Sequence, residues 1–578
     1  MWLGRWLSVC LIPLAGWILV SGLDDLFIGL VFIFARRRRL SAPADADLES
    51  APERRIAILV PLWREHRVIQ QMLQRNIGAI RYRNYEVFVG VYPNDQLTLR
   101  AVAEAARSLG RVHLAVCPHD GPTSKGDCLN SVHQRMVDYE ALHGIRFDII
   151  MTHDAEDLVH ADSLRLINWY SRDYQMVQMP VLPLPTGLGE LTHGLYCDEF
   201  AEFQQKDIPV RQRLGGFLPA NGVGTGFDRD SLDRLAARGR LFDPESLTED
   251  YETGFRLHAM GCRQIFVPLR IPAAGPVATR EYFPRNFRAA VRQRSRWVAG
   301  IALQGWQRHG WRGQAYWWWR DRKGLVGNLL APLANLFVLG FVASSLAIHV
   351  PAWVSHICTA TLCLSLSQAA LRGYCGARIY GARFVAALPL RMLWGNVVNC
   401  VATLSALSQF VQARLRRRSL AWRKTDHVYP AHAGARRDAR LGELLVRMRC
   451  LSISDVREAL LTRPPGLRLG EHLVQVQKIS RQHLYRALSY QSGIPLGLAH
   501  DEEVDCRATR ALPAETVRRW KVLPYRVDLG QLHVATADLP TPEMTGELAR
   551  LSALEIRFRL VQPEELEAMT AQYLPADS

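Results

Sequence analysis

The stretch FDIIMTHDAED, residues 147–157, joins an apolar run to a group of carboxylates. The apolar run predicts a buried strand, so Asp154, Glu156 and Asp157 would project at its carboxyl end. Carboxylates in this position can bind a hard divalent cation, Mg²⁺ or Mn²⁺, through oxygen. Such a cation can hold a nucleotide diphosphate and offset the charge that develops as it leaves. The same spacing of acids also occurs in solvated turns, so this stretch alone does not distinguish a metal site from a turn.

Around this stretch the sequence alternates between strand-like and helix-like runs. Apolar runs at 55–63, 85–93 and 112–118 are typical of strands, and amphipathic runs at 68–80 and 97–109 are typical of helices. The alternation predicts an α/β domain with a doubly wound sheet, mixed but mainly parallel. Ligands of such sheets bind beyond the carboxyl ends of the strands, which is where the carboxylates fall.

The bulk composition narrows the class of protein. The chain has 578 residues, enough for two or three domains, and a formal net charge of +16. Its basic residues gather beside apolar segments, at 35–40 and 413–424, which favours a membrane surface over nucleic acid. We find no nucleic-acid motif. The 11 cysteines have no metal-site spacing, which is typical of reduced thiols in a cytoplasmic or membrane setting.

Three apolar segments, at 6–34, 326–348 and 353–372, are long enough to be membrane helices, and the last two read as a hairpin. Asp24 and Asp25 interrupt the first, which indicates either a charged partner or a position at the bilayer boundary. The predicted organisation is a transmembrane helix at 1–35, a basic linker at 36–55, the α/β domain at 56–320, a transmembrane hairpin and interfacial helix at 321–425, and a regulatory domain at 430–578.

The stretch 388–413 contains several polar residues and is a poor lipid-facing span. The positive-inside rule requires an even number of spans between the two basic runs, and the hairpin already supplies two. We therefore predict that 388–413 is an amphipathic helix at the membrane interface. Trp317, Trp318 and Trp319 are predicted to be a membrane-interface anchor.

Further motifs surround the predicted strand ends. VPLWREHRVI (60–69) places Glu65 after the first strand, and Lys125 lies in the Gly/Ser-rich stretch GPTSKGDCLN (121–130). The glycine-rich stretch ANGVGTGFDRD (220–230) would let backbone approach a ligand closely. The remaining motifs are SLTEDYETGFRL (246–257), which contains Glu249 and Asp250, and VRQRSRWVAG (291–300), which contains Gln293, Arg296 and Trp297.

The order VPLWRE, SKGDCLN, DAED, TED and QRSRW resembles the membrane-integrated family-2 glycosyltransferases of the cellulose and hyaluronan synthase type. The finer resemblance is to the bacteriophage adsorption protein B (NfrB) type, through SGLDDLF (21–27), HDAED, LTEDYETGFRL and LAWRKTDHVYP (420–430). The resemblance covers roughly residues 56–320. It implies a nucleotide-sugar-binding GT-A fold.

The resemblance also implies roles for individual residues. Glu65 and Asp95 would contact the uridine of a UDP-sugar, and Lys125 would face an anionic part of it. Asp154 would bind the diphosphate, and Glu156 or Asp157 would complete the Mg²⁺ or Mn²⁺ site. Asp250, with Glu249 beside it, would be the catalytic base. Gln293, Arg296 and Trp297 would hold the acceptor, with Arg296 gripping the diphosphate.

The C-terminal region contains an internal repeat. RLGELLVRMRCLSISDVREAL (440–460) and RLGEHLVQVQKISRQHLYRAL (468–488) align without a gap at a spacing of 28 residues. The repeat resembles the cyclic di-GMP-binding MshEN domain, an α+β domain of type II secretion and pilus ATPases. The resemblance implies contacts from Arg440, Leu441, Gly442, Leu445, Arg468, Leu469, Gly470, Leu473 and Gln491. The family pattern expects glycine at Arg449 and Gln477 and glutamine at Arg463, and the chain departs from it there.

The sequence therefore predicts an inner-membrane, multi-pass glycosyltransferase with cytoplasmic catalytic and C-terminal domains. It would use a UDP-sugar, with UDP-N-acetylhexosamine as the expected donor, to extend an exopolysaccharide under activation by cyclic di-GMP. An outer-membrane export partner and membrane lipid would be its other contacts. Two alternatives stay open: an inactive cyclic di-GMP-sensing scaffold for an outer-membrane partner, and a transferase that adds a single sugar to a lipid carrier.

Overall fold

The computed structural model describes residues 2–35, 42–271, 275–344, 352–416, 440–447, 450–492, 494, 496–497, 504–528, 531–552 and 554–573. The chain forms two compact units, one from residues 1–106 and 111–429 and the other mainly from residues 430–578. The motifs at 36–39, 420–430 and Arg449 lie outside the described residues.

A seven-stranded mixed sheet forms the centre of the first unit, in the order β3-β2-β1-β4-β7-β5-β8. Its strands are β1 (Ile56–Pro61), β2 (Tyr85–Val91), β3 (Val112–Val116), β4 (Ile149–Thr152), β5 (Met176–Gln178), β7 (Thr225–Asp228) and β8 (Gln264–Phe266). Only β7 runs antiparallel to its neighbours. The sheet confirms the predicted α/β class, and the predicted strands at 55–63, 85–93 and 112–118 are β1, β2 and β3.

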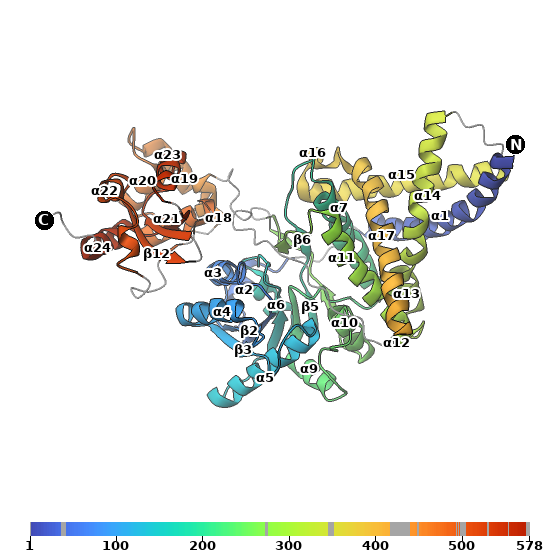
Figure 1. Ribbon diagram of the computed structural model, residues 1–578, viewed down its shortest axis with the longest axis horizontal. Helices are drawn as coiled ribbons and strands as arrows, with labels where there is room; N and C mark the ends of the chain where they lie inside the picture. Colours follow the sequence, from blue (N-terminus) through green and yellow to red (C-terminus); the bar gives the residue numbers. More distant parts are fainter. Residues whose placement is uncertain are drawn as a thin grey trace. The chain divides into compact units, whose positions relative to one another are not determined.

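Helices pack against this sheet, and its core consists of buried apolar residues from both (Figure 1). They are α3 (Ile69–Ala79), α4 (Gln96–Leu109), α5 (Lys125–His143), α6 (Ser163–Tyr170), α9 (Arg229–Ala236) and α10 (Glu249–Ala259). A short helix, α2 (Asp45–Ser50), precedes the sheet, and the pairs β6 (Val181–Pro183) with β11 (Thr279–Glu281) and β9 (Arg270–Ile271) with β10 (Gly275–Pro276) form two small sheets. The predicted helices at 68–80 and 97–109 are α3 and α4.

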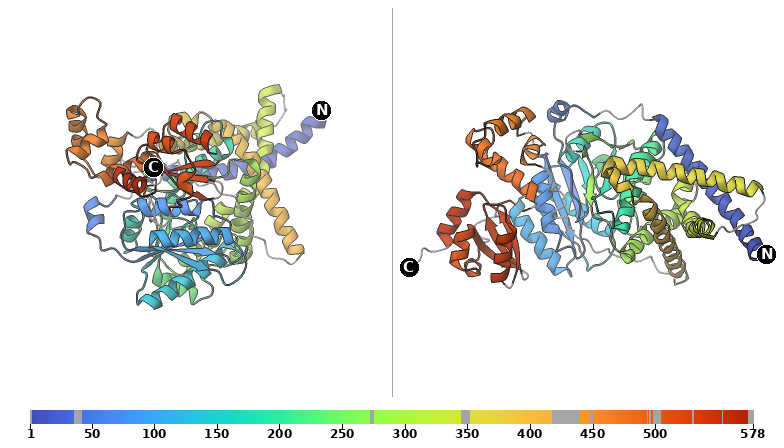
Figure 2. Two further views of the ribbon diagram at one scale, coloured as in Figure 1. Left: turned by 60° about the vertical axis from the view of Figure 1, so that its left-hand side comes forward. Right: turned by 90° about the horizontal axis from the view of Figure 1, so that it is seen from above.

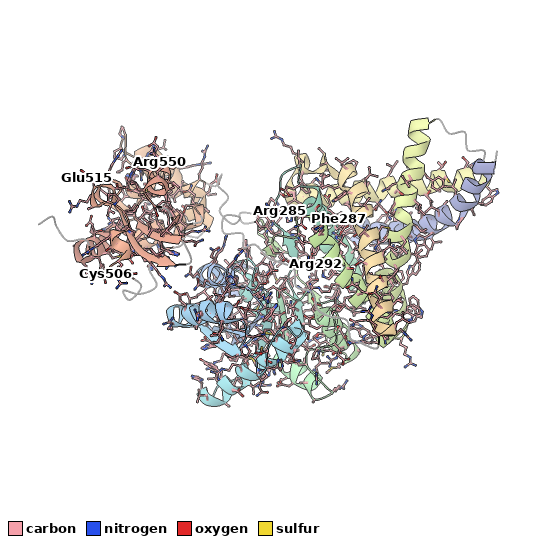
Figure 3. All side chains as sticks on the ribbon, viewed as in Figure 1. Arg285, Phe287, Arg292, Cys506, Glu515 and Arg550 are labelled. Carbon is pink, nitrogen blue, oxygen red and sulfur yellow. The ribbon has the colours of Figure 1, made fainter. Side chains whose placement is uncertain are left out.

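The other helices of the first unit form a group beside the sheet (Figures 1 and 2). They are α1 (Trp2–Ala35), α7 (Leu191–Glu202), α8 (Ile208–Arg213), α11 (Phe287–Trp297), α12 (Gly305–His309), α13 (Ala315–Arg322), α14 (Gly324–Ser344), α15 (Ala352–Tyr380), α16 (Ala382–Val385) and α17 (Leu388–Leu415). Two π-helical segments, η1 (Phe203–Asp207) and η2 (Val298–Gln304), continue α7 and α11. Phe287 and Arg292 of α11 are labelled in Figure 3.

Two of the described helices, over Leu11–Phe34 and Ala352–Tyr380, are long and apolar enough to cross a membrane. They pack side by side, and α15 also packs on α7. The predicted hairpin partner of α15 is α14, but α14 packs mainly along α17. The end of the segment 326–348 and most of the turn after it lie outside the described residues.

Asp24 and Asp25 of α1 have charged partners, which answers the question their sequence position raised. Asp24 pairs with Arg320 at 2.6 Å and with Lys323 at 2.7 Å, and Asp25 pairs with Lys323 at 2.8 Å. Arg320 also pairs with Asp207 of η1 at 2.8 Å. The N-terminal helix is therefore joined to α13 and η1 by ion pairs as well as by apolar contacts.

The tryptophans before α14 differ from the prediction. Trp317 is 5% exposed and Trp318 is fully buried, and both pack in one cluster with Ile28 of α1 and Tyr251 of α10. A residue buried in protein cannot anchor at a membrane interface, so the prediction is wrong for these two. They were misread because a run of tryptophans next to arginines occurs in both settings.

The polar residues of α17 face protein partners. Arg391 is fully buried and donates two hydrogen bonds to the Asp198 carboxylate of α7, at 2.5 and 3.0 Å. Asn396 bonds Asn335 of α14 at 3.0 Å, and Gln409 donates to Ser295 of α11 at 3.3 Å. These contacts supply a packing reason for the polarity of 388–413. The interfacial location itself stays a prediction.

The second unit contains helices first and a sheet second. The helices α18 (Leu441–Arg447), α19 (Ile453–Thr462), α20 (Leu469–Gln475) and α21 (Arg481–Ser492) confirm the repeat, since α18 and α20, and likewise α19 and α21, begin 28 residues apart. Then come η4 (Ala508–Arg510), α22 (Ala514–Trp520), β12 (Val522–Asp528), β13 (Gln531–Thr536), α23 (Pro542–Leu551), β14 (Glu555–Leu560) and α24 (Pro563–Tyr573). The predicted hairpin at 521–538 is β12 with β13.

Candidate functional site

The motif carboxylates of the first unit meet at a cavity of about 530 Å³ beyond the strand ends. Its lining includes nine predicted site residues: Glu65, Lys125, Asp154, Glu156, Glu249, Asp250, Gln293, Arg296 and Trp297. They come from β1 and β4 loops, α5, α10 and α11, which are far apart in the sequence. The volume lies in the range of small-molecule binding sites.

Lys125 is the cation at the centre of the acidic group. It is the first residue of α5, whose N-cap Ser124 accepts a hydrogen bond from the Asp127 amide at 3.2 Å. Its ammonium lies 2.7 Å from the Asp154 carboxylate. Burial opposes its charge, but Asp154, Glu249 and Asp250 outweigh burial and raise the pKa of Lys125. The amino end of α5 and this ammonium together form a favourable place for an anion.

Glu249 and Asp250 begin α10 and are held in the cavity wall. Burial, and then the neighbouring Asp250 carboxylate, raises the pKa of Glu249 to about 7, while Lys125 opposes this shift. Burial likewise raises the pKa of Asp250, with Lys125 opposing it. Thr248 precedes them as the N-cap residue but makes no side-chain capping bond. The pair is therefore more than the solvated start of a helix.

The glycine-rich stretch lies directly against this pair. A Cβ atom at Gly222 would be 2.5 Å from Asp250 Oδ2 and 3.2 Å from Lys125 Nζ, and the backbone φ there is +73°. Only glycine adopts this conformation without strain and leaves room for both side chains. Backbone at Gly222 therefore lies close to two candidate site residues, and the approach of 220–230 to a ligand stays a prediction.

Asp154 and Glu156 line the cavity, whereas Asp157 does not. Asp157 is fully buried, and its Oδ2 accepts hydrogen bonds from His153 Nδ1 at 2.7 Å and from the Asp154 amide at 3.0 Å. This arrangement favours Glu156 over Asp157 as the second ligand of a metal. Asp157 and His153 instead brace the turn that presents Asp154.

The donor set fits a hard divalent cation that takes part of its shell from the substrate. Two carboxylates at neighbouring positions, Asp154 and Glu156, match the way Mg²⁺ is held by one or two carboxylates plus substrate phosphates. Within the described ranges, no group of three or more His, Cys, Asp or Glu side chains could hold a metal ion. The fit therefore depends on oxygens that a bound diphosphate would bring.

Asp95 takes another position. It is 7% exposed, it accepts a hydrogen bond from the Arg64 amide at 2.5 Å, and it precedes α4. It does not line the cavity, so it supports the loop that carries Glu65. Trp63 and Tyr92 do line the cavity, with ring centroids 5.4 Å apart, and sequence reasoning missed both.

The acceptor-side motif lies where α11 passes into η2. Gln293 Oε1 is buried and has no hydrogen-bond partner among the described residues. The Trp297 ring lies 6.2 Å from Phe200 and 6.4 Å from Phe283. Both π-helical segments contribute to the cavity wall, through Phe203 and Ile301. Such irregular turns are frequent at functional sites, and no sequence signal predicts them.

The cavity also has charged lining residues that the sequence motifs did not indicate. They are Glu199, Glu202, Asp207, Arg211, Asp321 and Arg372. The signal that could have found Arg372 is a charge near the end of an otherwise apolar helix. The acids of α7 and η1 lie among both polar and apolar residues, so their spacing in the sequence did not predict which way their side chains point.

In the second unit, the repeat residues divide between surface and core. Arg440 and Arg468 are exposed, and the latter pairs with Asp538 at 3.1 Å. A Cβ atom at Gly442 would be 2.7 Å from Val456, and one at Gly470 would be 2.4 Å from Leu484. The glycines therefore allow close helix packing, which explains them without the ligand contacts that the resemblance implies.

The other repeat residues serve the same core. Leu445 and Leu473 are fully buried in the cluster that joins the four helices, and Leu441 and Leu469 pack against it. Gln491 is half-buried near the end of α21. Among the described repeat residues named above, Arg440 and Arg468 are the two whose side chains are exposed.

Two protein-family models match separate parts of the chain. A model of the glycosyltransferase-like family 2 matches residues 52–300, and the MshEN domain model matches residues 492–578. The chain is similar to bacteriophage adsorption protein B of Escherichia coli K12, with 34% identity over 599 residues, covering 96% of this chain and 80% of the relative. Bacteriophage N4 adsorption protein B of Escherichia coli O157:H7 has the same identity and coverage.

Solved structures are similar over parts of the chain. A mannosyltransferase of Pyrobaculum calidifontis, in complex with GDP-Man and Mn²⁺, is 17% identical, with a TM-score of 0.39, and covers 66% of this chain and 99% of its own. MshE with cyclic di-GMP is 25% identical, with a TM-score of 0.22, and covers 23% of this chain and 99% of its own. On its identity and coverage with the Escherichia coli proteins, the chain belongs to the bacteriophage adsorption protein B family, with a family 2 glycosyltransferase domain and an MshEN domain.

Proposed function

We propose that the protein is an inner-membrane glycosyltransferase that uses a UDP-sugar, UDP-N-acetylhexosamine, to extend an exopolysaccharide and is activated by cyclic di-GMP. The observation that carries the proposal is the single cavity in which Lys125, Asp154 and Asp250 meet. The catalytic and C-terminal domains would lie in the cytoplasm, beside the membrane helices.

The donor would bind at the strand ends. The amino end of α5, Lys125 and Arg296 would face the diphosphate, and Glu65 would contact the uridine. Asp154 and Glu156 would hold the divalent cation, which would supply charge neutralisation for the leaving diphosphate. Trp63 and Tyr92 offer aromatic surface near Glu65 for the nucleobase.

Asp250 would act as the base. An acceptor hydroxyl gives its proton to the Asp250 carboxylate as its oxygen forms a bond to the anomeric carbon, and the bond from that carbon to the phosphate oxygen breaks. UDP leaves with the bonding electrons. Gly222 leaves room for the Asp250 carboxylate and the Lys125 ammonium, because a Cβ atom at this position would overlap Asp250. Glu249, with its pKa near 7, is the weaker candidate, because it is often protonated at neutral pH.

Gln293 and Trp297 would hold the acceptor, since the Gln293 carbonyl is buried without a partner in the described structure and Trp297 belongs to an aromatic group. In the second unit, Arg440 and Arg468 would contact the phosphates or guanines of cyclic di-GMP. Gln491 would close that site.

The test is UDP release by membranes that carry the full chain, across a panel of UDP-sugars, with and without cyclic di-GMP. We expect release from one donor, increased by cyclic di-GMP and lost in Asp250→Asn. Release that ignores cyclic di-GMP would contradict the regulation, and undiminished release in Asp250→Asn would contradict the assigned base.

A second candidate is a membrane scaffold for an outer-membrane partner. The name of the Escherichia coli relatives, which refers to bacteriophage adsorption, favours it. The carboxylate pair of Glu249, which is buried, and Asp250, which is half-buried, argues against it, because burial raises the pKa of both acids and a pure scaffold does not need such a pair. Absence of UDP release from every donor would favour this candidate.

A further inference from the structure

The side chain of Gln178 has no part in the proposed chemistry, yet its buried amide is fully hydrogen-bonded. Gln178 ends β5 and is 1% exposed. Its Oε1 accepts hydrogen bonds from the Asn221 amide at 3.0 Å and from the Thr225 hydroxyl at 2.6 Å. Its Nε2 donates to the Val223 carbonyl at 3.1 Å and to the Met179 carbonyl at 2.7 Å. An amide has two donor hydrogens and two acceptor lone pairs, so this one is used completely.

Three of the four bonds reach residues 221–225, which we call the glycine loop. The loop contains Gly222 and Gly224, whose φ angles are +73° and +60°, and its last residue, Thr225, begins β7. The pairing of β5 with β7 is made by backbone atoms and needs no side-chain bond. The amide of Gln178 therefore fixes the loop in addition to the strand pairing.

The amide of Gln178 fits the loop in one orientation. Reversing it would place its oxygen against the Val223 and Met179 carbonyls and its NH₂ group against the Asn221 N–H. Buried polar groups without a partner are costly, so the reversed arrangement is disfavoured. The glycine loop therefore has one position, relative to β5, at which all four bonds form.

The fixed loop forms one wall of the space that holds the Asp250 carboxylate. Gly222 lies between the two residues whose backbone groups bond Gln178, and both of those residues line the cavity. A Cβ atom on Gly222 would be 2.5 Å from Asp250 Oδ2 and 3.2 Å from Lys125 Nζ, so the bare backbone lies against both groups. A shift of the loop would change the space that the carboxylate and the ammonium share.

We propose that Gln178 is a positioning residue for sugar transfer, which acts through Gly222 on the Asp250 carboxylate. Gln178 is not among the described residues that line the cavity, so its effect is indirect. This inference rests on the proposed glycosyltransferase function and adds a residue that sets the geometry of its base. A displacement of about 1 Å at reacting groups can cost about 100-fold in rate, so a loosened loop should lower kcat.

The test uses the full chain in membranes, with the UDP-sugar that it turns over. Gln178→Met keeps the length of the side chain and removes all four bonds. We expect kcat to fall about 10-fold to 100-fold. The donor KM should stay close to that of the unsubstituted chain, because the proposed donor ligands Glu65 and Asp154 follow β1 and β4.

Asn168→Leu is the matched control. Asn168 lies on α6, is 2% exposed, and bonds Arg54 Nε at 3.2 Å and the Pro52 carbonyl at 3.0 Å through its side-chain amide. None of these three residues is among those that line the cavity. We expect this variant to lose thermal stability, as Gln178→Met does, and to keep its kcat.

A double variant shows whether Gln178 acts through the loop. Gly222→Ala alone should lower transfer by about 100-fold, because the new Cβ displaces the Asp250 carboxylate. The effects of independent sites multiply in rate, whereas the effects of sites that share one partner do not. We expect Gln178→Met combined with Gly222→Ala to lower transfer no further than Gly222→Ala alone.

A milder pair of variants keeps the test decisive if Gln178→Met does not fold. Thr225→Val removes the hydroxyl that donates to Gln178, and Thr225→Ser retains it. We expect Thr225→Val to lower kcat about tenfold, as for the loss of one buried hydrogen bond. Thr225→Ser should keep a kcat close to that of the unsubstituted chain.

The positioning role would be overturned by an unchanged kcat in Gln178→Met, or by equal losses in Thr225→Val and Thr225→Ser. Multiplied effects in the double variant would overturn it too, as would a loss of kcat in Asn168→Leu equal to that in Gln178→Met. Absence of UDP release from the unsubstituted chain with every donor would instead contradict the glycosyltransferase proposal, and the positioning role would fall with it.

Discussion

The motif residues of the first unit line a cavity, whereas most of those of the second unit pack together in a helical core. In the first, Lys125, Asp154, Glu249 and Asp250 converge on a cavity and bear the cost of buried charge. In the second, Leu445, Leu473 and the repeat glycines converge on each other and fill a helical core. Spacing alone does not distinguish a motif that binds from a motif that packs. What distinguishes them is whether the side chains meet around open space or around one another.

Asp250→Asn tests the first half of this comparison and has the largest expected effect. A general base contributes about 100-fold to 10,000-fold, so sugar transfer should fall by that amount. The melting temperature should stay equal or rise, because the change removes a charge that burial disfavours. Rates in membranes and thermal unfolding of the purified protein check both expectations. A large drop in melting temperature would mean that Asp250 is structural.

Matched glycine substitutions set the two units directly against each other. Gly222→Ala should lower transfer by about 100-fold, because the new Cβ displaces the Asp250 carboxylate. Gly470→Ala should instead destabilise the second unit by about 1–2 kcal/mol, through its overlap with Leu484. The measurements are transfer rates and amide hydrogen exchange in the second unit of the full chain. The comparison would be wrong if Gly222→Ala mainly lowered stability and Gly470→Ala mainly lowered transfer.

The pH dependence of stability sharpens the account of buried charge. Because the pKa of Glu249 is about 7 in the folded chain and near 4.5 when unfolded, the folded state binds the extra proton between these values. The contribution of Glu249 to stability should therefore decrease as pH rises from about 4.5 to 7. Glu249→Gln should flatten this slope in melting curves recorded across that range. An unchanged slope would mean that Glu249 is not buried next to Asp250 in solution.

The exposed arginines carry the smallest expected effect on stability. Arg468→Ala should change the free energy of unfolding by less than about 0.5 kcal/mol, because its pair with Asp538 is solvent-exposed on both sides. Cyclic di-GMP affinity should fall about tenfold, as for a lost charged hydrogen bond. Equilibrium dialysis with labelled cyclic di-GMP measures this. Lys478→Ala, which removes a similarly exposed pair with Asp455 at 3.0 Å, is the matched control.

The sequence predicted the structure best where a single hydrophobic periodicity extends over a whole strand or helix. The strands β1 to β3, the helices α3 and α4, and the 28-residue repeat follow from periodicity and lie within a few residues of their predicted bounds. The convergence of acids at the strand ends follows from parallel topology, which places those ends at one edge of the sheet.

The sequence was least informative where a side chain had two directions open to it. Asp157 and Glu156 differ by one position, yet one bonds His153 inside the turn and the other lines the cavity. Trp318 looked suited to a membrane interface, but it packs in a cluster with residues from distant segments. Such partners are fixed by tertiary packing, which a single local pattern does not contain.

The ion pairs of Asp24 and Asp25 have a consequence for biosynthesis. The chain makes Asp24 296 residues before Arg320, so α1 leaves the ribosome long before its partners Arg320 and Lys323 exist. Carboxylates within a membrane segment are costly until they are paired. If α1 crosses a membrane as proposed, its ion pairs would form only after residues 320–323 have been synthesised, and a late segment of the chain would complete an early one.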